Sequence, residues 1–147
     1  MTVKVERAFD VEAPITEVWD VLTDETIRAE TISVVSEFEL RPGTEHNEVI
    51  WYLSLPIPLV DSTVAVRTRD VDRDPPRYVR FVGKSKVMTV TGEHELSETS
   101  SGCRVANRFV VDGKLPGIER FFKRNIDTEI ENFRRAITNR VDGVEER

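Results

Sequence analysis

The sequence predicts an α+β fold in which a curved antiparallel sheet of seven strands wraps around a long carboxy-terminal helix. Two observations predict it. In seven segments apolar residues alternate with polar ones, which is the period of half-buried strands. Residues 117–141 instead place apolar residues at every third or fourth position, as an amphipathic helix does. A sheet with one apolar face must cover that face, and only this helix is large enough to do so.

The amino-terminal part predicts a strand followed at once by a helix. Residues 3–11 alternate as a strand, with Arg7 as the one charged residue on the apolar face. Pro14 suits the first turn of a helix, where the missing N–H of proline costs nothing. The amphipathic stripe that follows comprises Ile15, Val18, Trp19 and Leu22 and ends near Asp24. Residues 25–32 could add a second short helix.

Six further strands follow, each ended by a short polar turn or by Pro and Gly residues. They are predicted at residues 34–41, 48–55, 62–72, 77–83, 86–97 and 103–112. Short turns favour pairing between consecutive strands, so these strands should form an antiparallel meander. The closing helix should be about 37 Å long, as long as a small sheet is wide. Its buried stripe is Ile118, Phe122, Ile126, Ile130, Phe133, Ile137 and Val141.

Length and composition limit the classes of function. The 147 residues are enough for one domain, 1–147, with a structured core expected over about residues 3–141. A net charge of −6 and a pI of about 5.1 argue against nucleic-acid binding, which needs a local excess of Lys and Arg. With a single cysteine, Cys103, and two histidines, the sequence predicts no structural zinc site, and no motif calls for a cofactor.

The sequence predicts neither export nor a membrane span. The amino terminus has no apolar signal region, and no apolar run approaches the roughly 20 residues that a spanning helix needs. A cytoplasmic protein is therefore expected. Transient contact with a membrane surface and the oligomeric state are left open by the sequence.

A cavity is the expected by-product of this fold. One helix is too slender to fill the trough of a strongly twisted sheet, so apolar space should remain beneath it. The first helix follows the first strand directly and should form a wall of that cavity. Sites of this kind hold apolar ligands.

The stretch VEAPITEVWDVLTD, residues 11–24, combines an Ala-Pro pair, a Val-Trp pair three residues after Ile, and Leu-x-Asp. It resembles the opening signature of the SRPBCC superfamily of START-related, polyketide-cyclase-like proteins, and the element order resembles that superfamily over about residues 3–141. Residues 55–69 are similar to START-type members, which have Arg-Asp where this chain has Asp61-Ser62. The resemblance implies the helix-grip fold. It implies less about function, because members include lipid carriers, quinone-binding proteins, cyclases, hormone receptors and chaperone partners.

Polar residues on the inner strand faces are candidates for orienting a ligand. The turn between the last two strands places His94 opposite or diagonal to Asn107, and the superfamily's strand order places Arg7 on the other side of Asn107. Such a patch could orient a ligand carbonyl or carboxylate, because Arg binds oxyanions bidentately. The alternative is that Arg7 reaches the sheet edge or pairs with a carboxylate, and that His94 is a hydrogen-bonded histidine near the surface.

Glu119 is in line with the buried stripe of the last helix. It could act as an acid or base at the cavity mouth, or it could only complement the positive end of the helix. The full set of predicted ligand-binding residues is Arg7, Trp51, Asp70, Phe81, Met88, His94, Asn107, Phe109, Glu119, Phe122 and Ile126.

Three functions remain compatible with these residues. The first is binding or transport of a hydrophobic small molecule, such as a lipid, an isoprenoid or a polyketide-like compound. The second is a cyclase or dehydratase that uses the same cavity, whose candidate acids and bases are Asp70, His94, Glu119, Tyr52 and Tyr78. The third is a protein-interaction or regulatory module, which would use the outer sheet face or the apolar LPIPL loop at residues 55–59.

Overall fold

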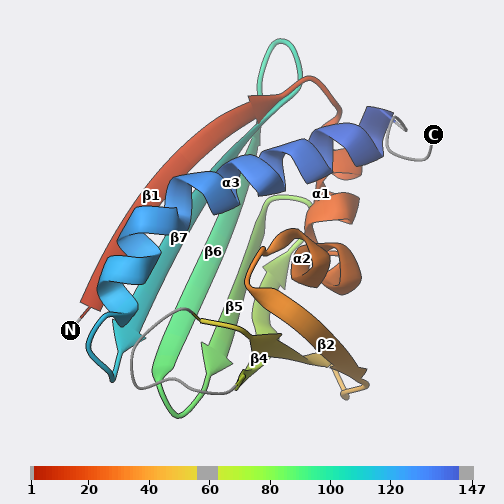
Figure 1. Cartoon of the computed structure of the whole chain (residues 1–147). Helices are drawn as coiled ribbons and strands as arrows, with labels where there is room; N and C mark the ends of the chain where they lie inside the picture. Colours follow the sequence, from red (N-terminus) through yellow and green to blue (C-terminus); the bar gives the residue numbers. More distant parts are fainter. Residues whose placement is uncertain (1, 56–62, 143–147) are drawn as a thin grey trace.

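The structure is a computed structural model that describes residues 2–55 and 63–142, and it has the predicted helix-grip architecture (Figure 1). The elements lie within about two residues of their predicted bounds. Two predicted features lie outside the described residues: the start of one strand at residue 62, and most of the LPIPL loop. In chain order they are β1 (Thr2–Val11), α1 (Ile15–Leu22), α2 (Glu25–Thr31), β2 (Val35–Arg41), β3 (Glu48–Leu53), β4 (Val64–Asp74), β5 (Tyr78–Lys84), β6 (Met88–Glu98), β7 (Cys103–Gly113) and α3 (Ile118–Asp142).

Local sequence signals explain the early turns of the chain. Pro14 precedes α1 with an extended backbone, as expected for a residue that opens a helix but cannot continue a strand ladder. The side chain of Asp24 accepts a hydrogen bond of 3.0 Å from the backbone N–H of Ile27 and caps α2. These two signals turn the chain from β1 into two consecutive helices before β2 begins.

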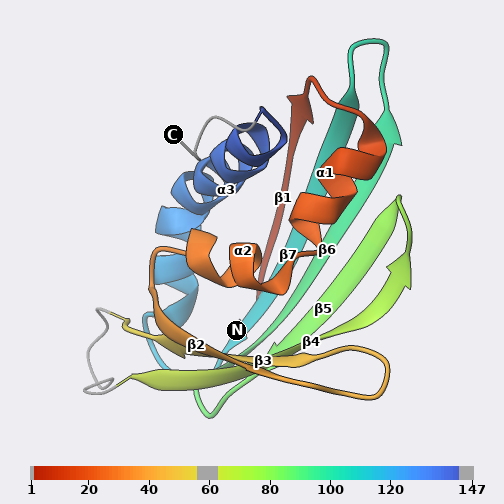
Figure 2. The ribbon, with the colours of Figure 1, turned by 90° about the vertical axis from the view of Figure 1, so that its right-hand side faces the viewer.

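The strands of the described residues form one sheet with the order β1-β7-β6-β5-β4-β3-β2. Every neighbouring pair is antiparallel, so the predicted meander from β2 to β7 is confirmed, with β1 added beside β7. The sheet curves strongly, and all three helices lie on its inner side (Figures 1 and 2). The predicted packing of the long terminal helix α3 against this inner side is therefore confirmed.

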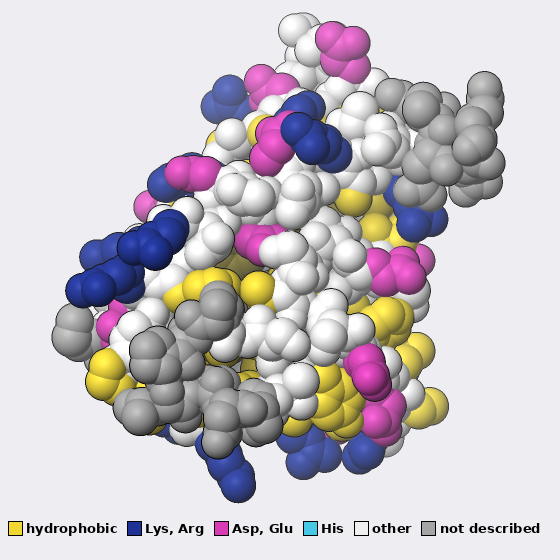
Figure 3. All heavy atoms as spheres, in the orientation of Figure 1, with side chains coloured by type: hydrophobic (Ala, Val, Ile, Leu, Met, Phe, Trp, Pro, Cys, Tyr) yellow, Lys and Arg dark blue, Asp and Glu magenta, His cyan; other side chains and the backbone are white. Residues whose placement is uncertain are grey.

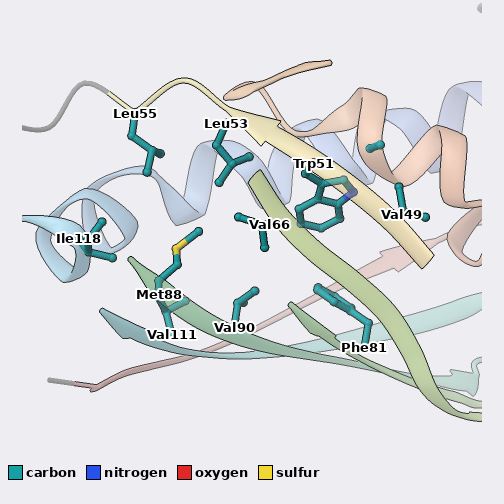
Figure 4. Packing of buried hydrophobic residues seen from close by; sticks show 11 residues of the cluster. Val49, Trp51, Leu53, Leu55, Val66, Phe81, Met88, Val90, Val111 and Ile118 are labelled. Carbon is teal, nitrogen blue, oxygen red and sulfur yellow. The ribbon is translucent and has the colours of Figure 1, made fainter. Parts of the chain in front are cut away.

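The inner side holds two separate apolar clusters. One joins α1 to the carboxy-terminal half of α3 and to the adjoining ends of β5, β6 and β7, with Val18, Leu22 and Ile137 fully buried in it. The other lies between β3, β4, β5, β6, β7 and the start of α3, with Trp51, Phe81 and Met88 as its large members (Figure 4). The first cluster is a filled core. The second surrounds the cavity described below.

No helix in the described ranges, 2–55 and 63–142, is both long enough and apolar enough to cross a membrane. The longest of them, α3, carries charged residues along its exposed face.

Candidate functional site

A partly open cavity lies between the inner face of the sheet, α2 and α3. The centres of water-sized molecules can occupy about 120 Å³ of it, about ten times what one water needs. The lining is almost wholly apolar and comes from α2, α3 and the strands from β3 to β7. In Figure 3, hydrophobic side chains are visible in a hollow beside α3. Seven of the predicted ligand-binding residues line the cavity: Trp51, Phe81, Met88, His94, Phe109, Phe122 and Ile126.

The position of the cavity corrects one expectation about the early helices. No described residue of α1 is part of the lining, because α1 packs into the filled cluster. The prediction that the first helix walls the cavity is therefore wrong. That wall is formed by α2, which contributes Arg28 and Thr31, and by Ile32 and Val34 after it.

Aromatic rings form one side of the cavity. Trp51 and Phe81 meet edge to face, with ring centroids 5.9 Å apart (Figure 4). Phe81 lies directly over Gly92 of the neighbouring strand, and a Cβ at Gly92 would overlap its ring. The glycine thus lets the phenyl ring lie flat against the sheet and leaves the space above it open.

His94 and Asn107 face each other across β6 and β7, as their spacing predicts. The Nδ1 atom of His94 lies 2.7 Å from Oδ1 of Asn107. The amide nitrogen of Asn107 donates to the carbonyl oxygens of Arg7 and Val105, at 3.1 and 3.4 Å. Because that nitrogen is engaged, Oδ1 faces the imidazole and Nδ1 must be the donor. Nε2 then carries the lone pair, and it has no hydrogen-bond partner among the described residues.

The environment of His94 keeps it neutral. Burial, and after it the positive charge of Arg28, lowers the pKa of His94 from 6.5 to about 4. The side chain is 2% exposed and packs among the rings of Phe81, Phe109 and Phe133. At neutral pH the cavity therefore contains an uncharged imidazole with a fixed tautomer.

A buried ion cluster joins α2 to β4. Arg28 Nη1 donates to one oxygen of Asp70 at 2.6 Å, and Arg73 Nη2 donates to the other at 2.7 Å. The side chains of Arg28 and Asp70 are 9% and 1% exposed. Burial alone would raise the pKa of Asp70, but the charges and hydrogen bonds of Arg28 and Arg73 outweigh it and hold that pKa below its usual value. One carboxylate is thus shared by two guanidinium groups, and the cluster has a net charge of about +1.

A β-bulge brings Arg73 into this cluster. The register of β4 against β5 shifts between Asp70 and Asp72, which leaves Val71 exposed. Without the bulge, strict alternation would direct Arg73 to the outer face of the sheet. The shift returns it to the inner face beside Asp70.

The sequence reasoning missed Arg28 and Arg73. One signal could have found a partner: Asp70 lies on the apolar face of a strand, and a buried carboxylate requires a nearby cation. Which cation it would be could not be read from the sequence, because Arg28 is 42 residues away along the chain.

The other predicted polar residues are not part of the cavity lining. Arg7 Nε donates to Asp127 of α3 at 2.6 Å, and the side chain of Arg7 is 44% exposed. This arrangement corresponds to the alternative in which Arg7 pairs with a carboxylate. Asn107 and Asp70 do not line the cavity themselves. They are hydrogen-bonded to His94 and Arg28, respectively, which do. Glu119 is half-buried in the first turn of α3.

The model of one protein family matches residues 2–138, nearly the whole chain, and its description is "polyketide cyclase / dehydrase and lipid transport". The chain belongs to this family. The resemblance to polyketide-cyclase-like proteins seen in the sequence is thereby confirmed. No curated protein matches the chain in sequence.

Several solved structures share the fold of this chain. The Zhui aromatase/cyclase from Streptomyces sp. R1128 is 16% identical with a TM-score of 0.76, over 96% of both chains. A conserved protein from Geobacillus kaustophilus is 19% identical with a TM-score of 0.75, again over 96% of both chains. The di-domain aromatase/cyclase StfQ of the steffimycin pathway is 15% identical with a TM-score of 0.74; 97% of this chain aligns with 53% of that one.

In this member of the family, His94 should make the folding free energy depend on pH. The unfolded chain takes up a proton on this histidine below about pH 6.5, whereas the folded protein does so only near pH 4. The unfolded state therefore binds more protons between these values, and stability falls as the pH falls. We expect His94 to contribute a loss of about 2 kcal/mol between pH 7 and pH 5.

Urea unfolding at the two pH values measures this effect. His94→Gln should lose about 2 kcal/mol less than the unmodified protein between pH 7 and pH 5. His46→Gln, which removes the other histidine, is the matched control and should behave as the unmodified protein does. An equal loss in His94→Gln and the unmodified protein would contradict the buried neutral imidazole.

Proposed function

We propose that this protein binds and carries a hydrophobic small molecule in the cavity between the sheet and α3. The observation that carries the proposal is the cavity itself: open space that can be reached from the surface, enclosed by apolar side chains and by a few polar groups at one place. Transfer of apolar area from water supplies affinity at roughly 25 cal/mol per Å², and a small number of polar groups can fix the orientation of the ligand.

A cyclase or dehydratase is the second candidate, and the aromatase/cyclases among the structural neighbours are the observation in its favour. The chemistry of the cavity supports it less. A general base works best with a pKa near the working pH, and His94, with a pKa of about 4, is a weak base. The carboxyl oxygens of Glu129 accept hydrogen bonds from the backbone N–H and the hydroxyl of Ser33.

Of the remaining candidates for acid–base chemistry, Glu119 does not line the cavity, and the other three are committed elsewhere. Asp70 is held by two arginines. The hydroxyls of Tyr52 and Tyr78 donate to Glu39 and Glu93, at 3.1 and 2.7 Å, away from the cavity lining. Within the described part of the cavity lining, the only carboxylic acid is Glu129, and both of its oxygens are engaged by Ser33, so the carrier function is preferred.

A protein-interaction module is the least supported of the three functions. It would be favoured by a cavity that side chains fill, and this cavity is open. The LPIPL loop, the other basis for that function, lies mostly in residues 56–62, outside the described ranges.

Native mass spectrometry of freshly purified protein tests the carrier function. We expect a co-purified compound of lipid-like mass, or retention of at least one member of a panel of fatty acids, isoprenoids and quinones. Trp51 lines the cavity, so its fluorescence should change when a compound binds. Repeated absence of any bound mass, together with no retention from the panel, would contradict the proposal.

A further inference from the structure

Two of the polar residues in the cavity lining carry a nitrogen that has no partner among the described residues. Five polar residues line it: Arg28, Thr31, His94, Asn125 and Glu129. Three of these bond within their own surroundings: Thr31 and Asn125 donate to carbonyl oxygens one turn earlier in their helices, and Glu129 accepts from Ser33. Arg28 and His94 differ, because each has a nitrogen without a partner among the described residues.

Arg28 holds an unused donor in a buried position. Its terminal nitrogens donate to Asp70 at 2.6 Å and to the carbonyl oxygen of Leu22 at 3.2 Å. Its Nε–H has no partner, and within residues 2–55 and 63–142 it is the only side-chain nitrogen or oxygen fully shielded from solvent that has none. A buried donor without a partner costs free energy, and charged groups cost most, so proteins keep few of them. The residue is 8% exposed and borders the cavity.

The charge around Arg28 is not balanced. Arg28 and Arg73 share the single carboxylate of Asp70, which leaves one positive charge in excess. His94 adds no charge, because it is neutral. A buried excess charge is stabilised by a counter-charge that makes hydrogen bonds to it. Because Arg73 is 27% exposed and Arg28 is nearly inaccessible to water, a counter-charge in the cavity would act chiefly on Arg28.

Arg28 and His94 both line the cavity and both contact the ring of Phe81, and the charge of Arg28 acts on His94. The guanidinium carbon of Arg28 is 5.3 Å from the centroid of the Phe81 ring, and the ring of His94 stacks at 6.3 Å from the same centroid. One of the two residues offers a hydrogen-bond donor, and the other offers an acceptor at Nε2. The rest of the lining, toward Met88, Val111 and Phe122, is apolar.

We propose that the ligand is an apolar molecule ending in a carboxyl group, and that this group binds between Arg28 and His94. The inference rests on the proposed carrier function and names its ligand class. A carboxyl oxygen can accept from Nε–H of Arg28, and the carboxyl proton can be donated to Nε2 of His94. If the proton passes completely to Nε2, the O–H bond breaks and an N–H bond forms; the carboxylate then lies between the new imidazolium and Arg28, and the net charge of the site stays at about +1.

Esters and alcohols of the same length match the site less well. A methyl ester can accept from Arg28, but it has no proton for His94 and no charge. An alcohol can donate to His94, but it cannot become an anion beside two arginines. Comparison of the three compounds therefore isolates the carboxyl group from the apolar body.

The experiment measures the affinity of the full chain for decanoic acid, methyl decanoate and 1-decanol through Trp51 fluorescence, with native mass spectrometry as a second readout. We expect the acid to bind at least about tenfold more tightly than the other two compounds. Arg28→Lys keeps a positive charge for Asp70 but loses Nε–H, so the affinity for the acid should fall about tenfold, while that for the ester, which can make only a neutral hydrogen bond to Arg28, should fall much less. Arg104→Lys, in an exposed pair with Asp10, is the matched control and should change neither affinity.

Each outcome decides between the proposals. Equal affinities for the three compounds would overturn the carboxyl site and leave the carrier function standing. An equal loss for acid and ester in Arg28→Lys would also overturn it, because the residue would then act only by holding α2 in place. Binding of none of the three compounds would overturn the carboxyl site, and the panel of fatty acids, isoprenoids and quinones would then decide on the carrier function separately.

Discussion

Replacing Asp70 with Asn is expected to lower the free energy of unfolding by about 3–5 kcal/mol. Asn keeps the size of the side chain but removes the charge that balances Arg28 and Arg73. Because the Arg28 side chain is only 9% exposed, water cannot replace the lost carboxylate. Breaking a buried pair in this way leaves an uncompensated charge, which is far more costly than the net gain from forming the pair. Urea unfolding monitored by circular dichroism measures the change.

The chain offers a matched control for this substitution. Asp10 pairs with Arg104 at 3.1 Å on the surface, with both side chains more than half exposed. Asp10→Asn should therefore cost at most about 1 kcal/mol, as exposed ion pairs usually do. If Asp70→Asn cost no more than Asp10→Asn, the cluster would not be the buried charge network described above.

Replacing Val90 with Phe is expected to weaken ligand binding strongly without unfolding the protein. Val90 lies on β6, is 8% exposed and lines the cavity, so a phenyl ring at this position would occupy the open space. Overpacking of a filled core commonly costs about 1–3 kcal/mol, and the cost should be near the lower limit here because the added atoms enter a void. Affinity for any compound retained by the unmodified protein should fall at least about tenfold.

A neighbouring residue on the same strand provides the control for the cavity. Thr91 is next to Val90 and does not line the cavity, because successive side chains of a strand point to opposite faces. Thr91→Phe should leave ligand affinity unchanged. Full ligand binding by a folded Val90→Phe variant would mean that the ligand binds elsewhere, and the carrier function would lose its site.

The two substitutions test different parts of one arrangement. The ion cluster fastens α2 to β4, and α2 forms the wall of the cavity that the sheet and α3 do not supply. Asp70→Asn removes the carboxylate that holds α2, and with it the wall of the cavity, in place. Val90→Phe instead fills the space that this wall encloses. Loss of binding in both variants, with loss of stability mainly in the first, is the expected combined result.

Much of the fold could be predicted because the signals for it are local. The alternation of strand residues, the Pro14 start of α1 and the three-and-four spacing of α3 each lie within about 25 residues of sequence. Antiparallel pairing between consecutive strands then fixes the register. That is why the position of His94 opposite Asn107 could be read from the length of one turn.

The sequence by itself determined the helix-grip fold, the inner faces of the central strands and most of the apolar residues around the cavity. Only the tertiary structure decided which partners the charged side chains have and which of these side chains are buried. Arg7 lies on the predicted strand, but its long side chain reaches Asp127 of α3 and stays half exposed. Arg28 comes from a short helix, and it meets Asp70 because the sheet curves beneath α2, while a bulge adds Arg73. Arg7 and Arg28 pair with carboxylates far away along the chain, and a shift of one residue in register brings Arg73 to the inner face. Local periodicity carries no information about such contacts.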